Sequence, residues 1–336
     1  MAAHVIESDT VKTRLNAQDQ APTVSVIVPA YNAAEFMAEC LDSVFAQTLV
    51  DFEVIVVNDG SGDTPVLERV LGPYRERIVY VHQENRGQAG ARNSGIRLAR
   101  AEYLAFLDSD DCWPPEYLST QMQLFRDNPS LDLVYADATL FGSGPVPRKT
   151  FMQTSAPPMT LDDLVSQGGQ ILPSGTLVKK HAIVEAGLFD ENLRPQGCED
   201  VDMWLRLAGR GAKIAFQGKV LFRRRIHGNA ATANEEKMVM SLLRALTKVD
   251  RAQLSATGLE SLEKQLIQAR GELGFMQWRK HLIEGDAAAA REDLRAAHAF
   301  FRSRKFTLAL LGVRLAPQVT IWGARTFLRK RGSPRS

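Results

Sequence analysis

The sequence predicts an α/β fold with a mostly parallel central sheet, followed by an all-helical C-terminal region. Three observations support this prediction: strand and helix patterns alternate through residue 107, three polar loops directly follow predicted strands, and the chain from residue 235 onward shows only helical patterns. Alternating strands and helices are typical of a parallel sheet with helices on both faces. Ligands of such sheets bind beyond the carboxyl ends of the strands. We therefore expect functional residues in the three loops, at residues 30–32, 58–63 and 108–111.

The elements before residue 107 follow from local patterns. Short β-branched or apolar runs predict strands, and apolar side chains spaced along one stripe predict helices. Thr64 followed by Pro65 suits the N-cap and first position of a helix. The predicted strands lie at residues 24–28, 52–57, 78–81 and 103–107, and the predicted helices at residues 33–47, from residue 64 onward, and at 88–99.

Beyond residue 111 the pattern is less regular. The predicted elements are helices at residues 114–126 and 199–209, strands at 131–135 and 220–226, a strand running into a helix at 177–187, and a long Gly/Pro-rich loop at 141–158. From residue 235 the chain is expected to be helical, with breaks near Gly258 and Gly285 and at Pro317. These patterns divide the chain into an N-terminal tail (residues 1–22), an α/β domain (23–229) and a helical C-terminal region (230–336).

The composition is that of an ordinary globular protein, with 45% hydrophobic and 24% charged residues. The first 22 residues lack the apolar segment of a secretory signal, so we expect a mobile tail there. No run of about 18 apolar residues predicts a transmembrane helix. Cys40, Cys112 and Cys198 lie far apart without metal-ligand spacing, which indicates free thiols in a reducing compartment. These features predict a cytoplasmic protein.

The charge distribution is uneven. From residue 294 to the end the sequence has ten Lys or Arg and no Asp or Glu, whereas the rest of the chain has a net charge of −8. Such a segment could lie peripherally on the anionic inner face of the cell membrane, where each basic residue contributes about 1 kcal/mol. The alternative is a helical pair packed on the α/β domain with a solvated basic face. The segment lacks a platform of interleaved aromatic side chains, so nucleic-acid binding is not expected.

The sharpest motif is Asp-Ser-Asp-Asp at residues 108–111. On an extended segment, the carboxylates of Asp108 and Asp110 point the same way and can share one cation. Mg²⁺ and Mn²⁺ favour oxygen ligands and commonly combine one or two carboxylates with substrate phosphates. The alternative is a solvated turn, since Asp and Ser are good turn formers. An EF-hand loop is excluded because Trp113 occupies the position that requires glycine.

Two further loops could contact a nucleotide. Asp59 follows a strand and could accept hydrogen bonds from a base or ribose, or it could belong to a helix-capping turn. Residues 85–93 open a helix, whose N-terminus favours anions, so Arg86 or Arg92 could pair with a diphosphate. The alternative is a loop-to-helix junction with solvated arginines. A dinucleotide fingerprint does not match, because its third glycine would fall on Pro65.

Acidic residues and a histidine complete the candidates. Glu199 and Asp200 precede an apolar helical run that contains Trp204, and acids at this position also serve as simple helix-dipole partners. His227 follows a predicted strand two residues after Arg225, and a lone histidine is either a ligand or a structural residue.

Taken in order, these motifs closely resemble those of family 2 glycosyltransferases. The matching segments are residues 24–32, 57–61, 85–93, 108–111, 199–204 and 225–227. The resemblance covers roughly residues 23–229 and implies a nucleotide-sugar-binding GT-A fold that inverts the anomeric centre. It does not cover the N-terminal tail or the last hundred residues.

The resemblance implies a role for each candidate. Asp108 and Asp110 would form the DxD motif and bind Mn²⁺ or Mg²⁺, with His227 completing the metal site. Asp200 would be the general base. The acceptor side would be shaped by Glu199 and Trp204. The donor nucleotide-sugar would be bound by Pro29, Ala30, Tyr31, Asn32, Asp59, Gly87, Arg92, Asp108 and Ser109.

The predicted function is therefore transfer of a sugar from a nucleotide-diphosphate sugar, expected to be a UDP-sugar, to a hydroxyl of a glycan or lipid-linked acceptor. Such a reaction belongs to surface polysaccharide or glycan biosynthesis. Residues 141–158 and 173–197 are expected to line the acceptor pocket. One alternative is a nucleotidyltransferase, although residues 30–33 lack its Gly/Arg-rich phosphate loop. The other is a catalytically silent nucleotide-sugar-binding module, against which the intact Asp200 argues.

Overall fold

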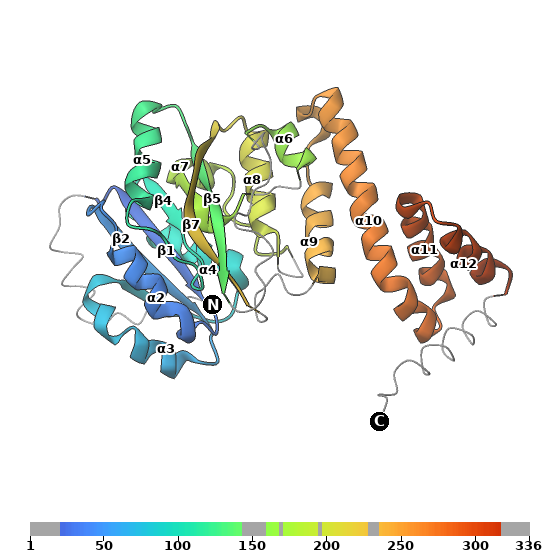
Figure 1. Ribbon diagram of the computed structural model, residues 1–336, viewed down its shortest axis with the longest axis horizontal. Helices are drawn as coiled ribbons and strands as arrows, with labels where there is room; N and C mark the ends of the chain where they lie inside the picture. The colour runs from blue at the N-terminus through green and yellow to red at the C-terminus, as the bar shows by residue number, and fades with distance from the viewer. Residues whose placement is uncertain (1–20, 143–158, 168–170, 194–196, 228–234, 317–336) are drawn as a thin grey trace.

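The structure of the chain is a computed structural model that describes residues 21–142, 159–167, 171–193, 197–227 and 235–316. Nearly all of the predicted N-terminal tail, most of the predicted 141–158 loop and the end of the basic segment fall outside the described residues. Figure 1 shows an α/β body from which a row of helices extends.

The described residues contain one seven-stranded sheet with the order β3-β2-β1-β4-β6-β5-β7. Strands β1 to β4 are mutually parallel, β7 is parallel to β5, and β6 runs antiparallel to both of its neighbours. The strands are β1 Val24–Ala30, β2 Phe52–Asp59, β3 Val79–Gln83, β4 Tyr103–Phe106, β5 Leu133–Gly142, β6 Thr176–Lys179 and β7 Ile214–Ile226. The predicted mostly parallel α/β sheet is therefore confirmed.

Helices cover both faces of this sheet. They are α2 Ala34–Phe45, α3 Thr64–Val70, α4 Gly87–Leu98, α5 Tyr117–Asp127, α6 Leu161–Ser166, α7 Lys180–Glu185 and α8 Glu199–Gly209, with short 3-10 helices at Gly72–Arg77, Pro173–Gly175 and Arg251–Gln253. Side chains of β1 alternate between the two faces: Ile27 belongs to the apolar core that includes α4 and α8, whereas Val26 and Val28 belong to the core that includes α2 and α5. This two-sided burial explains the continuous apolar runs of the central strands.

Several predicted boundaries were wrong by a few residues. Strands β5 and β7 are longer than expected because they pair with each other along most of their length, across a register shift after Tyr135. Helix α5 begins at Tyr117 rather than at residue 114. Thr64 is the first residue of α3 rather than its cap, and its hydroxyl donates to the carbonyl of Ser61 at 2.7 Å.

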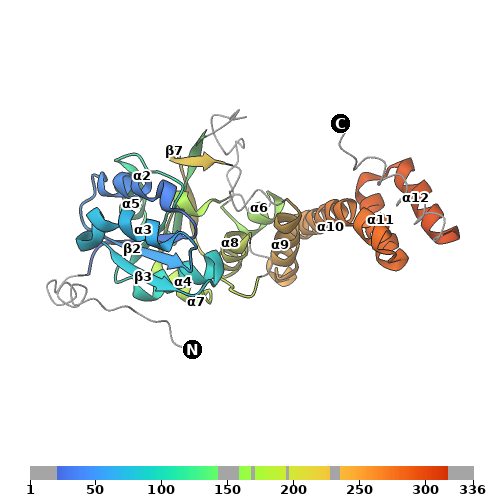
Figure 2. The ribbon, with the colours of Figure 1, turned by 90° about the horizontal axis from the view of Figure 1, so that it is seen from below.

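The C-terminal region is helical, as predicted. It consists of α9 Glu235–Thr247, α10 Ala256–Glu284, α11 Ala287–Phe301 and α12 Arg304–Leu315. Helix α9 and the first half of α10 join the core of the α/β body through Leu246 and Leu262. The far end of α10 packs with α11 and α12 around a separate small core that includes Leu294 (Figures 1 and 2).

Two of the predicted helix breaks can be compared with the structure. Gly285, with a φ of 95°, ends α10 as expected. The earlier break precedes Ala256, so Gly258 lies in the first turn of α10 instead of at the break. Pro317 falls outside the described residues. Among the described helices, none combines the length and apolar character needed to cross a bilayer.

Candidate active site

The first two predicted loops meet at the carboxyl edge of the sheet. Strands β1 and β2 end side by side, with Ala30 opposite Asn58. Beyond them the amide of Asn32 donates to the Ser61 hydroxyl at 3.1 Å, and the Asn32 side chain accepts from Gly62 N at 2.8 Å. Pro29 and Ala30 are buried within β1, whereas Tyr31 is 56% exposed. Tyr31 and Asn32, which are both exposed, are thus the residues of this segment that offer side-chain surface to a ligand.

Asp59 anchors the start of helix α4. Its buried carboxylate accepts from the Gln83 side chain at 2.7 Å and from the backbone amides of Arg86 at 2.8 Å and Gly87 at 2.7 Å. This is a helix-capping role, played across the sheet edge from β2. It satisfies two amides at the N-terminus of α4, where helix amides lack partners within the helix.

The four residues at 108–111 divide into two environments. Asp108 and Asp110 are partly exposed, and Ser109 between them is half-buried. Asp111 is buried and accepts from the amide of Arg225 at 2.9 Å. Burial, together with the charges of Asp110 and Asp108, raises the pKa of Asp111 well above its ordinary value. Asp111 is therefore a structural residue, and the two outer carboxylates are the ones available for chemistry.

The residues proposed as metal ligands come from different elements. The imidazole Nε2 of His227, just past β7, lies 2.9 Å from a carboxylate oxygen of Asp110. Within the described residues, no group of three or more His, Cys, Asp or Glu side chains is placed to hold a metal ion. Asp110 and His227 nevertheless offer an adjacent carboxylate and imidazole, which Mn²⁺ or Mg²⁺ can bind while keeping open positions for substrate phosphates. The donor set therefore suits a site that the substrate completes.

Arg92 connects the two acidic parts of the site. Its guanidinium donates to Asp108 at 2.7 Å and to Glu199 at 2.6 Å, and its side chain is only 1% exposed. Burial by itself lowers the pKa of Arg92, but the charges of Asp108 and Glu199 outweigh this effect and raise it above its ordinary value. The predicted contact between Arg92 and a diphosphate is corrected here: a buried cation needs anionic partners, and both of its partners belong to the protein.

Asp200 lies beside this network, in the first turn of α8. Burial and then the charge of Glu199 raise the pKa of Asp200 to about 7, although Arg92 and the amide of Val201 lower it. The structure therefore gathers the loop after β4 and the start of α8 into one site, with Arg92 between them. A carboxylate that titrates near neutral pH is suited to exchange protons with a substrate.

Trp204 does not reach the surface of this site. It is fully buried, its indole N–H donates to the carbonyl of Ile171 at 3.0 Å, and its ring lies edge-on to Phe189. The prediction that Trp204 shapes the acceptor side is corrected to a supporting role: it packs α8 against the body and so fixes the position of Asp200.

The comparison with protein families identifies the domain. The family model described as Glycosyl transferase family 2 matches residues 25–167. Over these residues the chain is similar to family 2 glycosyltransferases. The nucleotidyltransferase alternative is thereby set aside, and the predicted enzyme class is supported.

Relatives of this glycosyltransferase domain occur in several bacteria. Uncharacterised glycosyltransferases of Rickettsia felis and Rickettsia typhi are 32% and 34% identical over 238 and 224 residues, which is 68% and 63% of this chain. The chain spans less than two thirds of these relatives, with matches covering 39% and 66% of their lengths. Chondroitin synthase of Escherichia coli is 35% identical over 133 residues, which is 39% of this chain and 18% of the synthase.

Solved structures share the fold at low sequence identity. Residues 1–349 of Staphylococcus aureus TarS in complex with UDP superpose with a TM-score of 0.60 at 19% identity, covering 93% of each chain. The mannosyltransferase PcManGT from Pyrobaculum calidifontis, in complex with GDP-Man and Mn²⁺, gives a TM-score of 0.54 at 19% identity, covering 95% of this chain and 89% of that one. These likenesses confirm the GT-A type of fold.

Sequence reasoning included Ser174 and Glu191 only within a segment expected to line the acceptor pocket and missed their individual contacts with the candidate site. Ser174 accepts from the amide of Asp108 at 3.0 Å, and its carbonyl accepts from Trp113 at 2.6 Å. Glu191 accepts from Arg86 at 2.5 Å and from Asn93 at 2.9 Å, so Arg86 is paired with a carboxylate as well. These partners lie far apart in sequence, and no local pattern marks them.

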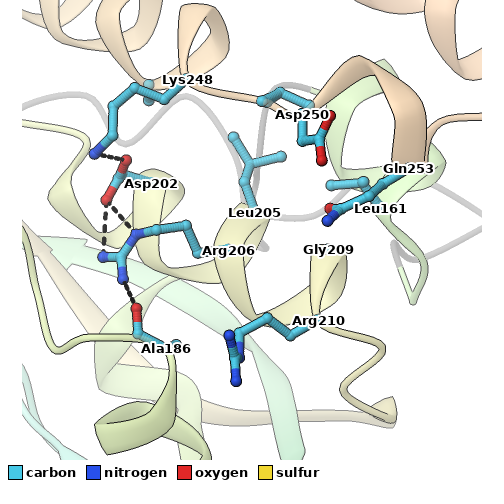
Figure 3. A pocket seen from close by; sticks show the side chains of 12 residues that line it. Leu161, Ala186, Asp202, Leu205, Arg206, Gly209, Arg210, Lys248, Asp250 and Gln253 are labelled. Carbon is cyan, nitrogen blue, oxygen red and sulfur yellow. Dashed lines mark hydrogen bonds and ion pairs between the residues drawn. The ribbon is translucent and has the colours of Figure 1, made fainter.

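A cavity of about 220 Å³ lies beside α8, and its lining includes Asp202, Leu205 and Arg206 of that helix but not Asp200 (Figure 3). Its central charges pair with one another: Asp202 accepts from Arg206 at 2.9 Å and forms an ion pair with Lys248, and Arg206 also donates to the carbonyl of Leu188. None of the individually predicted site residues lines this cavity, although Ala186, from the 173–197 segment expected to line the acceptor pocket, does. Its contacts tie the segment after α9 to α8 and therefore have a structural explanation.

Proposed function

We propose that this glycosyltransferase domain transfers a sugar, with inversion, from a nucleotide-diphosphate sugar to an acceptor hydroxyl, with Asp200 as the general base. The observation that carries the proposal is the buried Arg92, which joins Asp108 on the donor side to Glu199, the neighbour of Asp200. Inverting transfer needs a base opposite the departing nucleotide, and this arrangement keeps the two acidic groups in one fixed site.

The proton transfer follows from the environment of Asp200. In its ionised form, Asp200 takes the proton of the acceptor hydroxyl as that oxygen attacks the anomeric carbon. The bond between the anomeric carbon and the phosphate oxygen breaks on the opposite face, so the configuration inverts. A pKa of about 7 makes Asp200 a stronger base than an exposed carboxylate while leaving much of it ionised at neutral pH.

On the donor side, Asp108, Asp110 and His227 would hold Mn²⁺ or Mg²⁺. When bound, the cation offsets the charge that develops on the departing diphosphate. Tyr31 would contact the nucleoside, supported by its exposure at the end of β1. The backbone and side chains of Pro29, Ala30, Asn32, Asp59, Gly87 and Ser109 are proposed to complete the donor pocket. A UDP-sugar is the proposed donor, since the similar TarS fold was solved with UDP and with UDP-GlcNAc.

The proposed acceptor is a glycan or lipid-linked glycan at the inner face of the cell membrane, in surface polysaccharide or glycan biosynthesis. The similarity to chondroitin synthase supports a polysaccharide acceptor. The surface of α12 supports membrane contact, because its leucines at i, i+3 and i+7 are exposed beside basic residues. These leucines are Leu308, Leu311 and Leu315, and the basic residues of α12 are Arg304, Lys305 and Arg314.

Replacing Asp200 by Asn tests the proposal. Asp200→Asn is expected to bind UDP with nearly unchanged affinity in calorimetry while turnover falls by about 10²–10⁴-fold, the usual contribution of a positioned acid–base group. Asp190→Asn is a matched control, since Asp190 pairs with Lys248 and makes no described contact with Asp108, Arg92 or Asp200. Both variants are assayed with a panel of UDP- and GDP-sugars, and the product's anomeric configuration is determined by NMR.

Three outcomes would contradict the proposal. A loss of donor affinity in Asp200→Asn as large as the loss of turnover would show that Asp200 is not the base. Products that retain the donor configuration would exclude the single displacement. Absence of both transfer and donor hydrolysis in the wild type, despite UDP binding, would favour the catalytically silent binding module.

A further inference from the structure

The end of strand β7 is fastened to the loop at residues 108–112. The backbones of Arg223 and Cys112 exchange hydrogen bonds of 2.8 and 3.1 Å, forming an antiparallel bridge. Two residues on, the amide of Arg225 donates to Asp111 at 2.9 Å. The end of β7, and His227 just after it, therefore lie alongside the acidic loop.

The side chain of Arg225 makes a second set of contacts with the same loop. Its Nε donates to the carbonyl of Asp110 at 2.9 Å, and its terminal nitrogen pairs with Glu39 of α2. The guanidinium lies over the rings of Phe36 and Phe141, with its central carbon 4.8 and 4.3 Å from their centroids. The side chain is only 13% exposed, so these contacts define a fixed orientation.

These contacts surround the pair formed by Asp110 and His227. Residues 225 and 227 project to the same side of an extended strand, and Phe36 accordingly contacts both: its ring lies 5.0 Å from the His227 ring. The main chain of Asp110 is held by Arg225, and its side chain lies 2.9 Å from His227. Residues of helix α2 and of strands β5 and β7 thus meet at the Arg225 guanidinium, beside the pair formed by Asp110 and His227.

We propose that Arg225 is a positioning residue that holds Asp110 and His227 at the separation required to bind the divalent cation together. The proposal rests on the cation site of the proposed function. A planar guanidinium offers several donors in fixed directions, which a lysine ammonium does not reproduce. Lysine at this position keeps the charge but cannot donate to Asp110 and Glu39 in one plane while stacking on an aromatic ring.

The test measures Mn²⁺ binding to the full chain, without turnover, by electron paramagnetic resonance in the presence of UDP. Arg225→Lys is expected to weaken Mn²⁺ binding by about 10–100-fold, the usual effect of losing a group that orients metal ligands. Turnover at saturating Mn²⁺ is expected to fall much less than turnover at low Mn²⁺. Arg223→Lys is the matched control: Arg223 stacks on Phe141 and lies 3.8 Å from Glu39, but its side chain makes no described contact with Asp110.

A second variant covers the case in which Arg225→Lys does not fold. Glu39 is 50% exposed, so Glu39→Gln is expected to fold normally and to weaken Mn²⁺ binding by about two- to fivefold, the value of a partly exposed ion pair. If Arg225→Lys and Glu39→Gln both bind Mn²⁺ with the wild-type affinity, the proposal is overturned and the proposed function is left intact. Equal weakening in Arg223→Lys would also overturn it. A wild type that binds no Mn²⁺ would overturn both the proposal and the cation site.

Discussion

Replacing Glu199 by Gln tests how a neighbouring charge sets the pKa of Asp200, the proposed general base. The charge of Glu199 is the second-largest cause, after burial, of the raised pKa of Asp200. Gln keeps the shape and an oxygen that can accept from Arg92, which donates to Glu199 at 2.6 Å. The change therefore removes a negative charge with little disturbance of the packing, and it lowers the pKa of Asp200.

The expected size of the effect follows from Coulomb's law. Two unit charges roughly 6 Å apart interact by about 3 kcal/mol at an effective dielectric constant of 20. Solvent screening reduces this value, so we expect a change equivalent to about one to two pH units. As the proposed base, Asp200 would act in its ionised form, so we expect activity above its pKa of about 7 and a fall of about tenfold per pH unit below it. Glu199→Gln moves this acid limb to lower pH.

The assay is the pH dependence of kcat/KM at saturating Mn²⁺, compared between the wild type and Glu199→Gln. A cation near Asp108 favours the ionised form of Asp200 in both proteins, so the difference between them is the informative quantity. Glu191→Gln is the control, because Glu191 pairs with Arg86 and is not among the groups that shift the pKa of Asp200. An unchanged acid limb in Glu199→Gln, or a movement to higher pH, would refute the reasoning.

Three further predictions concern the cation, the packing and the membrane. Chelation by EDTA is expected to abolish transfer and added Mn²⁺ or Mg²⁺ to restore it; chelator-resistant activity would contradict the cation site. Gly95→Ala places a Cβ 2.4 Å from Ile27, which should cost about 1–3 kcal/mol and lower Tm in calorimetry, whereas Gly72→Ala meets open space and should not. Replacing the exposed leucines of α12 by serine should reduce co-sedimentation with anionic liposomes; undiminished binding would exclude this surface. The substituted residues are Leu308, Leu311 and Leu315.

Much of the fold could be predicted because its signals are local. The bounds predicted for the helix at residues 199–209 match α8, since an apolar stripe follows two acids that suit its first turn. The loops after β1, β2 and β4 were placed at one sheet edge because parallel strands end together. Strand β6 shows the limit of this reasoning: it pairs antiparallel with β4 and β5, and its short apolar run carries no information on direction.

The sequence by itself determined the α/β alternation and the order of the acidic motifs, because hydrophobic periodicity and turn residues act over a few positions. Only the tertiary structure decided which charges pair. Arg92 meets Glu199 across 107 positions of sequence, and Arg225 meets Glu39 across 186. A buried charge must find an opposite charge wherever folding brings one close, since desolvation is costly without it. For this reason Arg92, which was predicted to contact a phosphate, instead pairs with Asp108 and Glu199 and links the two acidic parts of the site.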